Sequence, residues 1–386
     1  MKYKLATSTW GNEEINAIKN VIDSDMYSMG NYVSAYEKEF AHYFGSKYAI
    51  MTSSGSTANL IMVASLFFMK ENNLKKGDEV IVPCVSWSTT YFPLQQYGLK
   101  LKFVDIDINT LNYDLKQLEA AISTKTKLIV AVNLLGNPND FNKINNFIKN
   151  KDIIIIEDNC ESMGSKFQDK YCGSFGLMGS FSSFFSHHIS TMEGGMIITD
   201  NEELHHILLC LRAHGWTRNL PDVNLVSNKK NNDFLESFRF VLPGYNVRPL
   251  EMSGAIGLEQ LKKLPKFIEK RNQNALIFKE LFSNLDEFII QEEIGQSSWF
   301  GFSFIINNDT QRESVIKKLT QNKIEVRPIV TGDFTQNEVL KYFDYEIFGQ
   351  INNAKKLHDN GFFVGNSHLD LKDELLYLKN ILYNLK

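Results

Sequence analysis

Short apolar runs alternate with segments of helical periodicity through the first 210 residues, and this alternation limits the fold more than any other feature of the chain. The four isoleucines at 153–156 carry no polar alternation, which is typical of a strand covered on both faces. Strands that alternate with helices form a mostly parallel, doubly wound sheet. We therefore expect an α/β protein with a seven-stranded sheet flanked by helices. The expected strands are residues 48–52, 79–83, 101–105, 127–133, 153–157, 180–184 and 196–199, and the helices include residues 13–22, 33–44, 56–69 and 115–122.

The pattern changes near Pro243-Gly244. Residues 250–282 place apolar side chains close to helical spacing, which predicts one or two long helices. Two strands and a last helix are expected at residues 300–306, 324–328 and 374–385. We predict two domains, a large one over residues 1–245 and a second unit of linking helices and a smaller α+β domain over residues 246–386.

The composition of the chain limits the classes of function that it can have. The chain has 386 residues, a net charge of -4 and no basic run, which argues against nucleic acid as a partner. The longest apolar run, residues 60–69, is too short to span a membrane, and residues 1–7 lack the apolar core of a signal peptide. The four cysteines show no metal-ligand spacing, and free thiols are typical of a cytoplasmic protein. They are Cys84, Cys160, Cys172 and Cys210.

A turn of small residues, Ser53-Ser54-Gly55-Ser56, joins an expected strand to an expected helix. Small side chains let the backbone close around a phosphate, and a helix N-terminus supplies N–H groups and a positive dipole. Taken alone, the same turn is better explained by a serine that caps the helix than by a phosphate site.

Two other strand ends carry groups of interest. Asp158 follows the four isoleucines, where a solvated acidic loop is a poor explanation. Trp87 follows the strand at 79–83, although a lone tryptophan belongs more often to a core than to a ligand platform. Ligands of open α/β sheets gather at the carboxyl ends of the strands, so we expect these groups to lie together.

These segments resemble the sugar aminotransferase and dehydratase branch of the fold type I pyridoxal-phosphate (PLP) enzymes. Histidine stands at 187 where that branch carries its Schiff-base lysine, and no lysine lies between Lys170 and Lys229. Within the branch, the chain is similar along its whole length to the 3-dehydratases that act on GDP-4-keto-6-deoxy-D-mannose on the route to colitose. The motifs that carry this similarity are residues 54–59, 85–91, 157–162, 186–189, 212–221 and 243–249.

The resemblance implies an aspartate aminotransferase-like fold and assigns a role to each motif. Asp158 would face the pyridinium nitrogen of PLP, and Trp87 would stack on its ring. Glu161 replaces the histidine or glutamine of the family near the ring hydroxyl, which leaves its role open. The residues expected at the cofactor phosphate are Gly55, Ser56, Ser182 and, from the partner subunit of an obligate homodimer, Asn246.

The resemblance also implies the reaction. L-Glutamate would convert PLP to its aminated form, pyridoxamine phosphate (PMP), and release 2-oxoglutarate; His187 would then act as the base in removal of the C3 hydroxyl, and ammonia would leave. An ordinary imidazole titrates near about 6.5 and accepts protons at neutral pH. His214, Arg218 and Arg327 are expected to bind the nucleotide sugar or glutamate.

Two other readings stay open, an aminotransferase that makes a 4-amino sugar of the perosamine type and a non-catalytic homologue that senses a ligand. A related group of dehydratases needs an iron–sulfur cluster, which takes about four placed cysteines. No cysteine follows Cys210, so we expect neither a cluster nor another metal.

Overall fold

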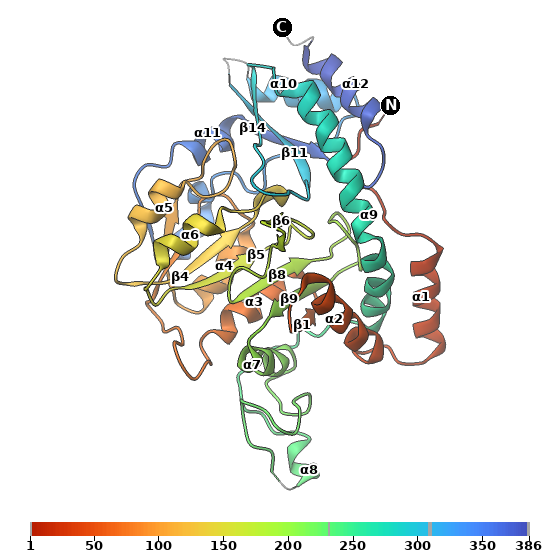
Figure 1. Ribbon diagram of the computed structural model, residues 1–386, viewed down its shortest axis with the longest axis vertical. Coiled ribbons are helices and arrows are strands. Elements are labelled where there is room, and N and C mark those ends of the chain that lie inside the picture. The colour runs from red at the N-terminus through yellow and green to blue at the C-terminus, as the bar shows by residue number, and fades with distance from the viewer. Residues whose placement is uncertain (1, 231, 308–310, 384–386) are drawn as a thin grey trace.

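The computed structural model describes residues 2–230, 232–307 and 311–383, and its centre is a large sheet (Figure 1). The strand order is β1-β9-β8-β5-β4-β2-β3-β13, and only β9 runs antiparallel to its neighbours. The strands are β1 Tyr48–Thr52, β2 Glu79–Pro83, β3 Lys100–Val104, β4 Thr126–Val132, β5 Ile154–Asp158, β8 Met178–Ser182, β9 Gly195–Thr199 and β13 Tyr345–Ile347. All seven expected strands are present.

The prediction of seven strands needs one correction, because β13 adds an eighth strand at the edge beside β3. It comes from the C-terminal part of the chain and is three residues long. A strand that short shows no periodicity in the sequence, and its pairing with β3 only becomes visible in the fold.

Helices cover both faces of the large sheet. Ile155 packs with α5 and α6 on one face, whereas the next residue, Ile156, packs with α3 and α4 on the other. Successive strand residues point to opposite faces, so the run of isoleucines is buried on both sides as expected. The helices before residue 245 are α1 Asn12–Asp23, α2 Asn31–Phe44, α3 Gly55–Ser65, α4 Ser88–Gln96, α5 Leu115–Ala121, α6 Phe141–Ile148, α7 Glu202–Arg212 and α8 Asp233–Glu236.

The C-terminal part begins with one continuous helix, α9 (Glu251–Phe282), which confirms the expectation of one or two long helices here. A four-stranded antiparallel sheet follows, in the order β10-β11-β14-β12. Its strands are β10 Phe288–Ile290, β11 Gly301–Ile306, β12 Val326–Arg327 and β14 Gly361–Gly365, and its helices are α10 Arg312–Gln321, α11 Asn353–Asn360 and α12 Lys372–Tyr383. The strand expected at 324–328 shrinks to two residues because Pro328 cannot donate to the ladder. The last two residues of the helix expected at 374–385 lie outside the described residues.

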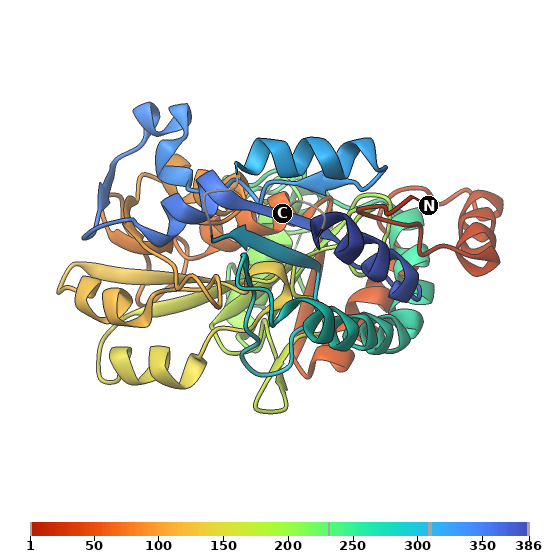
Figure 2. The same cartoon turned by 90° about the horizontal axis from the view of Figure 1, so that it is seen from above.

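Both ends of the chain belong to this C-terminal region (Figures 1 and 2). Tyr3 is fully buried in its core, and the Tyr3 hydroxyl donates to the carbonyl of Gly365 at 2.7 Å. Short elements complete the fold: β6 Lys166–Phe167, β7 Lys170–Tyr171, η1 Leu134–Gly136, η2 Phe334–Gln336 and η3 Glu338–Tyr342. The domain boundary at residue 245 stays a prediction.

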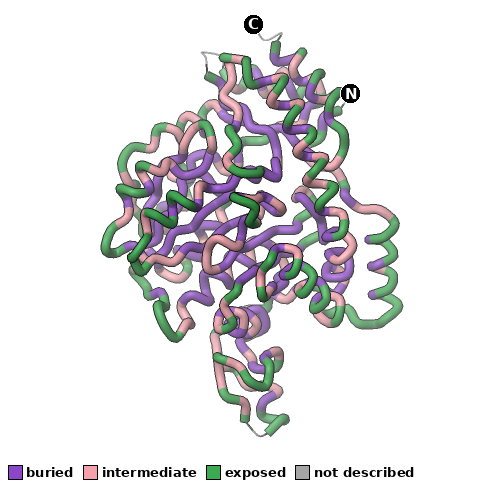
Figure 3. Tube along the Cα trace, in the orientation of Figure 1, coloured by how far each residue is buried: buried purple, intermediate pink, exposed green. Residues whose placement is uncertain are grey.

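One segment between α7 and α9 projects away from the body, as Figure 1 shows, and we call residues 216–230 and 232–242 the arm. Its surface is largely exposed (Figure 3) and includes Phe234 and Phe238, 85% and 66% exposed. None of the described helices is long and apolar enough to cross a bilayer.

Candidate active site

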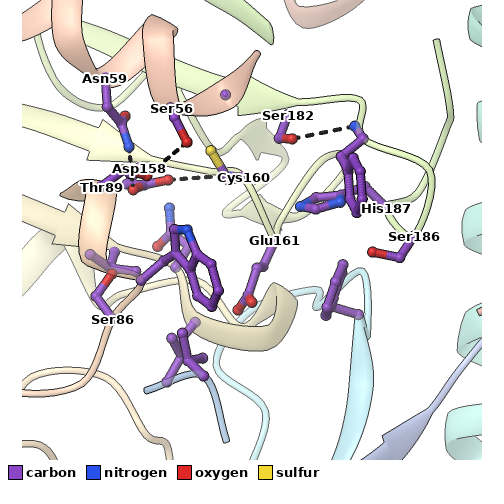
Figure 4. Close-up of a pocket in the computed structure, with 18 of the residues that line it drawn as sticks. Ser56, Asn59, Ser86, Thr89, Asp158, Cys160, Glu161, Ser182, Ser186 and His187 are labelled. Atoms are coloured by element: carbon purple, nitrogen blue, oxygen red, sulfur yellow. Dashed lines mark hydrogen bonds between the residues drawn. The ribbon is translucent and has the colours of Figure 1, made fainter. Parts of the chain in front are cut away.

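A cavity of about 530 Å³ opens at the carboxyl ends of the parallel strands, where the large sheet meets the C-terminal sheet. Its lining includes Cys160, Phe184 and Phe300 together with most of the residues singled out in the sequence (Figure 4). The structure therefore brings together residues from turns that lie far apart along the chain. The predicted site residues in the lining are Gly55, Ser56, Trp87, Asp158, Glu161, Ser182, His187 and Arg327.

The turn before α3 is both a helix cap and a close-packed cradle. Ser54 Oγ accepts from the Thr57 N–H at 3.2 Å, and Thr57 Oγ1 accepts from the Ser54 N–H at 2.9 Å. A Cβ added to Gly55 would lie 2.6 Å from Ser182 Cβ and 2.9 Å from Cys160 Sγ. Ser54 therefore caps the helix, and Gly55 beside it leaves the backbone at the start of α3 open to the approach of an anion.

Asp158 is fixed at the end of β5 by three donors. Its Oδ2 accepts from Asn59 Nδ2 at 2.8 Å and from Thr90 Oγ1 at 2.7 Å, and its Oδ1 accepts from the Cys160 N–H at 3.1 Å. The carboxylate is 6% exposed. Its orientation is therefore set by the fold before any ligand binds.

Glu161 faces the same cavity and accepts from the Leu135 N–H at 3.1 Å. Burial, followed by the charge of Asp158, raises the pKa of Glu161 to about 7, against the lowering effect of that hydrogen bond. A large fraction of Glu161 is therefore protonated at neutral pH, when it donates a hydrogen bond as well as accepting one.

His187 lies in the loop after β8, between the rings of Phe184 and Phe300, with ring centroids 5.9 and 5.2 Å away. Its Nδ1 is buried and has no hydrogen-bond partner. Burial, followed by the charge of Arg271, lowers the pKa of His187 to about 4. The expectation of an ordinary imidazole is therefore corrected: His187 is neutral across the physiological range, as a base must be before it takes a proton.

The residues present fit PLP held without a covalent bond. Trp87 is 57% exposed beside the cavity and offers a ring face, Asp158 offers a fixed carboxylate, and the start of α3 beside Ser182 offers an anion site. No lysine lines the cavity among the described residues. Nor do these residues contain a cluster of three or more histidine, cysteine or acidic side chains that could hold a metal.

Three predicted residues do not line this cavity within the described chain. His214 packs against Trp216, with ring centroids 4.9 Å apart, and the guanidinium of Arg218 lies 4.9 Å from the same indole ring. Asn246 is exposed, and its Oδ1 accepts from Arg248 Nε at 3.0 Å. All three lie at the arm or its base.

Sequence reasoning missed several residues that the fold brings to the site. Asn59 and Thr90 orient Asp158. Both lie near the starts of helices α3 and α4, within recognised motifs, so the sequence could have indicated that they lie at the site. Phe300 faces His187 from a segment more distant in sequence, and nothing local marks it.

The fold and this cavity define a PLP-type enzyme of the aminotransferase superfamily. The DegT/DnrJ/EryC1/StrS aminotransferase family matches residues 8–375, and the chain belongs to that family.

Several relatives are close. GDP-4-keto-6-deoxy-D-mannose 3-dehydratase of Yersinia pseudotuberculosis is 62% identical over 386 residues, covering 99% of this chain and 98% of that protein. A crystal structure of GDP-4-keto-6-deoxymannose-3-dehydratase with a trapped PLP-glutamate geminal diamine superposes with a TM-score of 0.97 at 60% identity, covering 99% and 100% of the chains. A histidine-to-asparagine variant of that enzyme with bound GDP-perosamine gives a TM-score of 0.98 at 60% identity, with the same coverage. GDP-perosamine synthase of Escherichia coli O157:H7 is more distant, 29% identical over 318 residues, 82% of this chain and 81% of that protein.

Proposed function

We propose that this chain is a PLP/PMP-dependent 3-dehydratase that removes the C3 hydroxyl of GDP-4-keto-6-deoxy-D-mannose and gives GDP-4-keto-3,6-dideoxy-D-mannose. The observation that carries this proposal is a complete cofactor cavity in which His187 replaces the lysine. Relatives that are 60–62% identical along the full length carry the name of this enzyme. L-Glutamate is the amino donor, and 2-oxoglutarate and ammonia are the other products.

The residues of the cavity bind the cofactor, and His187 accepts the proton that is moved in the reaction. When bound, PLP supplies an electron sink that stabilises negative charge next to the reacting carbon. Asp158 would hold the ring nitrogen, Trp87 would stack on the ring, and the turn at Gly55 and Ser56 with Ser182 would hold the phosphate. His187, neutral and unpartnered at Nδ1, takes up the proton whose loss drives departure of the C3 hydroxyl.

The site is completed across a homodimer. Asn246 is exposed and lies outside the cavity of its own chain, which is the position expected of a residue that reaches the partner's cofactor phosphate. His214 and Arg218 lie at the base of the arm and would bind the nucleotide sugar of the partner. Arg327 faces the cavity of its own chain with no carboxylate partner among the described residues, and would bind an anionic group of glutamate or the nucleotide.

The two other readings are weaker. A 4-aminotransferase needs a lysine beside the cofactor, and the described cavity offers none; the perosamine synthase is also only a distant relative. A ligand-sensing homologue has no physical need for the fixed carboxylate of Asp158 beside the buried, unpartnered Nδ1 of His187.

The test is mass spectrometry of the product formed from GDP-4-keto-6-deoxy-D-mannose with PLP and L-glutamate. We expect a sugar one oxygen lighter that keeps its ketone, with release of 2-oxoglutarate and ammonia. A 4-amino sugar would contradict the proposal in favour of the aminotransferase, and binding without turnover would favour the sensing role.

A further inference from the structure

A second buried layer lies behind His187, and its centre is the guanidinium of Arg271 on α9. Arg271 is 4% exposed, and its Nη1 donates to the carbonyls of Trp299 and Phe300, each at 3.2 Å. Its Nε is buried without a hydrogen-bond partner. No carboxylate forms an ion pair with it among the residues that the structure describes. A buried charge without a counterion costs folding free energy, so a functional reason for the position of Arg271 beside the site is to be sought.

The carbonyls that Arg271 binds belong to a strained turn. Trp299 has a φ of +47°, which is unfavourable for a bulky side chain. Other side chains hold the same turn: Asn366 Nδ2 donates to the Trp299 carbonyl at 2.9 Å, and His188 Nε2 lies 3.2 Å from the Ser298 carbonyl. The strained conformation therefore persists because side chains from three separate segments fix it.

The turn presents Phe300 to the site. The Phe300 ring contacts the imidazole of His187, and the Phe300 N–H donates to the Leu135 carbonyl at 2.9 Å. The N–H of Leu135 in turn binds Glu161. A shift of this turn would thus move one wall of the cavity and the backbone donor of Glu161 together.

We propose, on the basis of the function proposed above, that Arg271 is a positioning residue of the reaction. It fixes Phe300 against His187 through the two carbonyls, and its uncompensated charge opposes a second positive charge on the imidazole. His187 is therefore neutral before the reaction and can accept a proton. Once protonated, it gives this proton up readily to the departing C3 hydroxyl, which leaves as water. The proton that His187 takes up is the one it returns to the hydroxyl: the C3–O bond breaks, water leaves, and the electron pair left by the removed proton replaces the pair that departs with the oxygen.

The charges around His187 are consistent with this role. Arg271 is the cation that lowers the pKa of His187 after burial itself, and it acts in the same way on His188 and His368. Burial lowers the pKa of Arg271 to about 10, so it stays charged at neutral pH. The other ionisable groups that line the cavity are Asp158, Cys160, Glu161, Glu193 and Arg327.

The test compares Arg271→Gln with Arg271→Lys by an NMR titration of the full chain labelled at the histidine ring carbons. His187→Asn assigns the signal of His187. Lysine keeps the positive charge over the acidic range in which the imidazole titrates, whereas glutamine removes it and can still donate to a carbonyl. We expect Arg271→Gln to raise the pKa of His187 by about one unit or more and Arg271→Lys to raise it by less than about half a unit.

His205 is the internal control. Its pKa is lowered by burial, His206 and Arg212, and not by Arg271, so its titration should not move in either variant. An unchanged His187 in Arg271→Gln, with His205 in place, would overturn the proposal and leave Arg271 a structural residue. If Arg271→Gln does not fold, Arg271→Met is the second variant, because it fills similar space without a charge. A His187 pKa as low as in the native chain would overturn the proposal, and a pKa raised by about one unit or more would support it. No substrate is needed, so failure of the dehydratase assay would be a separate result.

Discussion

His187 is the residue on which the reaction depends most. In His187→Asn the side chain keeps its polarity and approximate size but cannot take a proton. We expect the rate of C3-hydroxyl removal to fall by roughly 10²–10⁴-fold, because that is the usual contribution of a positioned base. The measurement is the rate of formation of the deoxygenated sugar, followed by mass spectrometry.

His205→Asn is the matched control for this variant. His205 is also a half-buried histidine of lowered pKa, but it stacks on Tyr48 and does not line the cavity. Its replacement should leave the rate within a few-fold. Dehydration that proceeds unchanged in His187→Asn would remove His187 from the chemistry.

Glu161 gives the site a measurable dependence on pH. Its pKa is raised to about 7 in the folded chain by burial and by Asp158, from an ordinary value near 4.5. The folded state therefore binds more protons than the unfolded state between these pH values. The stability contributed by protonated Glu161 is fully present below about pH 4.5 and is lost as the pH rises through about 7.

Glu161→Gln removes this dependence, because glutamine stays neutral. Relative to the native chain, the free energy of unfolding of the variant should rise between pH 5 and pH 8, by up to about 3 kcal/mol. Urea denaturation at the two pH values measures it. A constant difference between the two proteins would show that Glu161 titrates normally. His187 titrates with the opposite sign at lower pH, so the comparison must be made against the native chain at each pH.

The sequence predicted the site residues that lie within a local motif. It did not predict the residues that reach the site from distant segments of the chain. Asp158 and Gly55 each stand at the end of a recognisable strand, where the sheet dictates their position. Arg271 and Phe300 reach His187 through tertiary contacts of two distant segments. Their roles depend on a strained turn at Trp299, and no pattern in the sequence indicates this turn.

At the scale of elements, the turn into α3 depends on the absence of a side chain at Gly55. In Gly55→Ala the new methyl group would press on Ser182 and Cys160. We expect the affinity for PLP, measured by absorbance titration, to fall by about tenfold or more, since a shift of the backbone or of Ser182 disturbs the anion site.

Gly77→Ala is the control for this change. Gly77 has a φ of +87° in a turn with open space around it and does not line the cavity. Alanine there should lower stability by about 1 kcal/mol through backbone strain and leave PLP affinity unchanged. Equal effects of the two substitutions on PLP affinity would mean that the cradle at Gly55 has no special role.

The elements themselves were predictable where the hydrophobic pattern was clear. The seven strands follow from short apolar runs, and α9 follows from a long run with helical spacing. β13 is set by its pairing with β3, which local sequence does not encode, whereas the early end of β12 could have been read from Pro328.

At the scale of the whole molecule, the exposed aromatic side chains of the arm predict that the chain forms a dimer. Aromatic side chains as exposed as Phe234 and Phe238 are typical of a surface that a partner covers. We expect the native chain to be a dimer by light scattering, and the double variant Phe234→Ser/Phe238→Ser to shift toward the monomer and lose activity, because Asn246 would no longer reach the partner's site.

Tyr342→Ser is the control for the arm. Tyr342 is 72% exposed on η3, outside the arm, and its replacement should leave the oligomeric state unchanged. A monomeric native chain that dehydrates its substrate at full rate would contradict both the dimer and the role of Asn246.

The pairing of β13 with β3 has a consequence for synthesis of the chain on the ribosome. β3 emerges early, but its outer edge stays without a hydrogen-bonding partner until residue 345 has been made. Lys102, on β3, is buried between Glu79 and Glu346 in the finished protein, so one of its two carboxylates also arrives last. An open strand edge invites pairing with other chains, and a charged lysine on that edge discourages it. The nascent protein thus carries its own protection against aggregation at β3, whose partner is the last strand of the large sheet to be translated among the described residues.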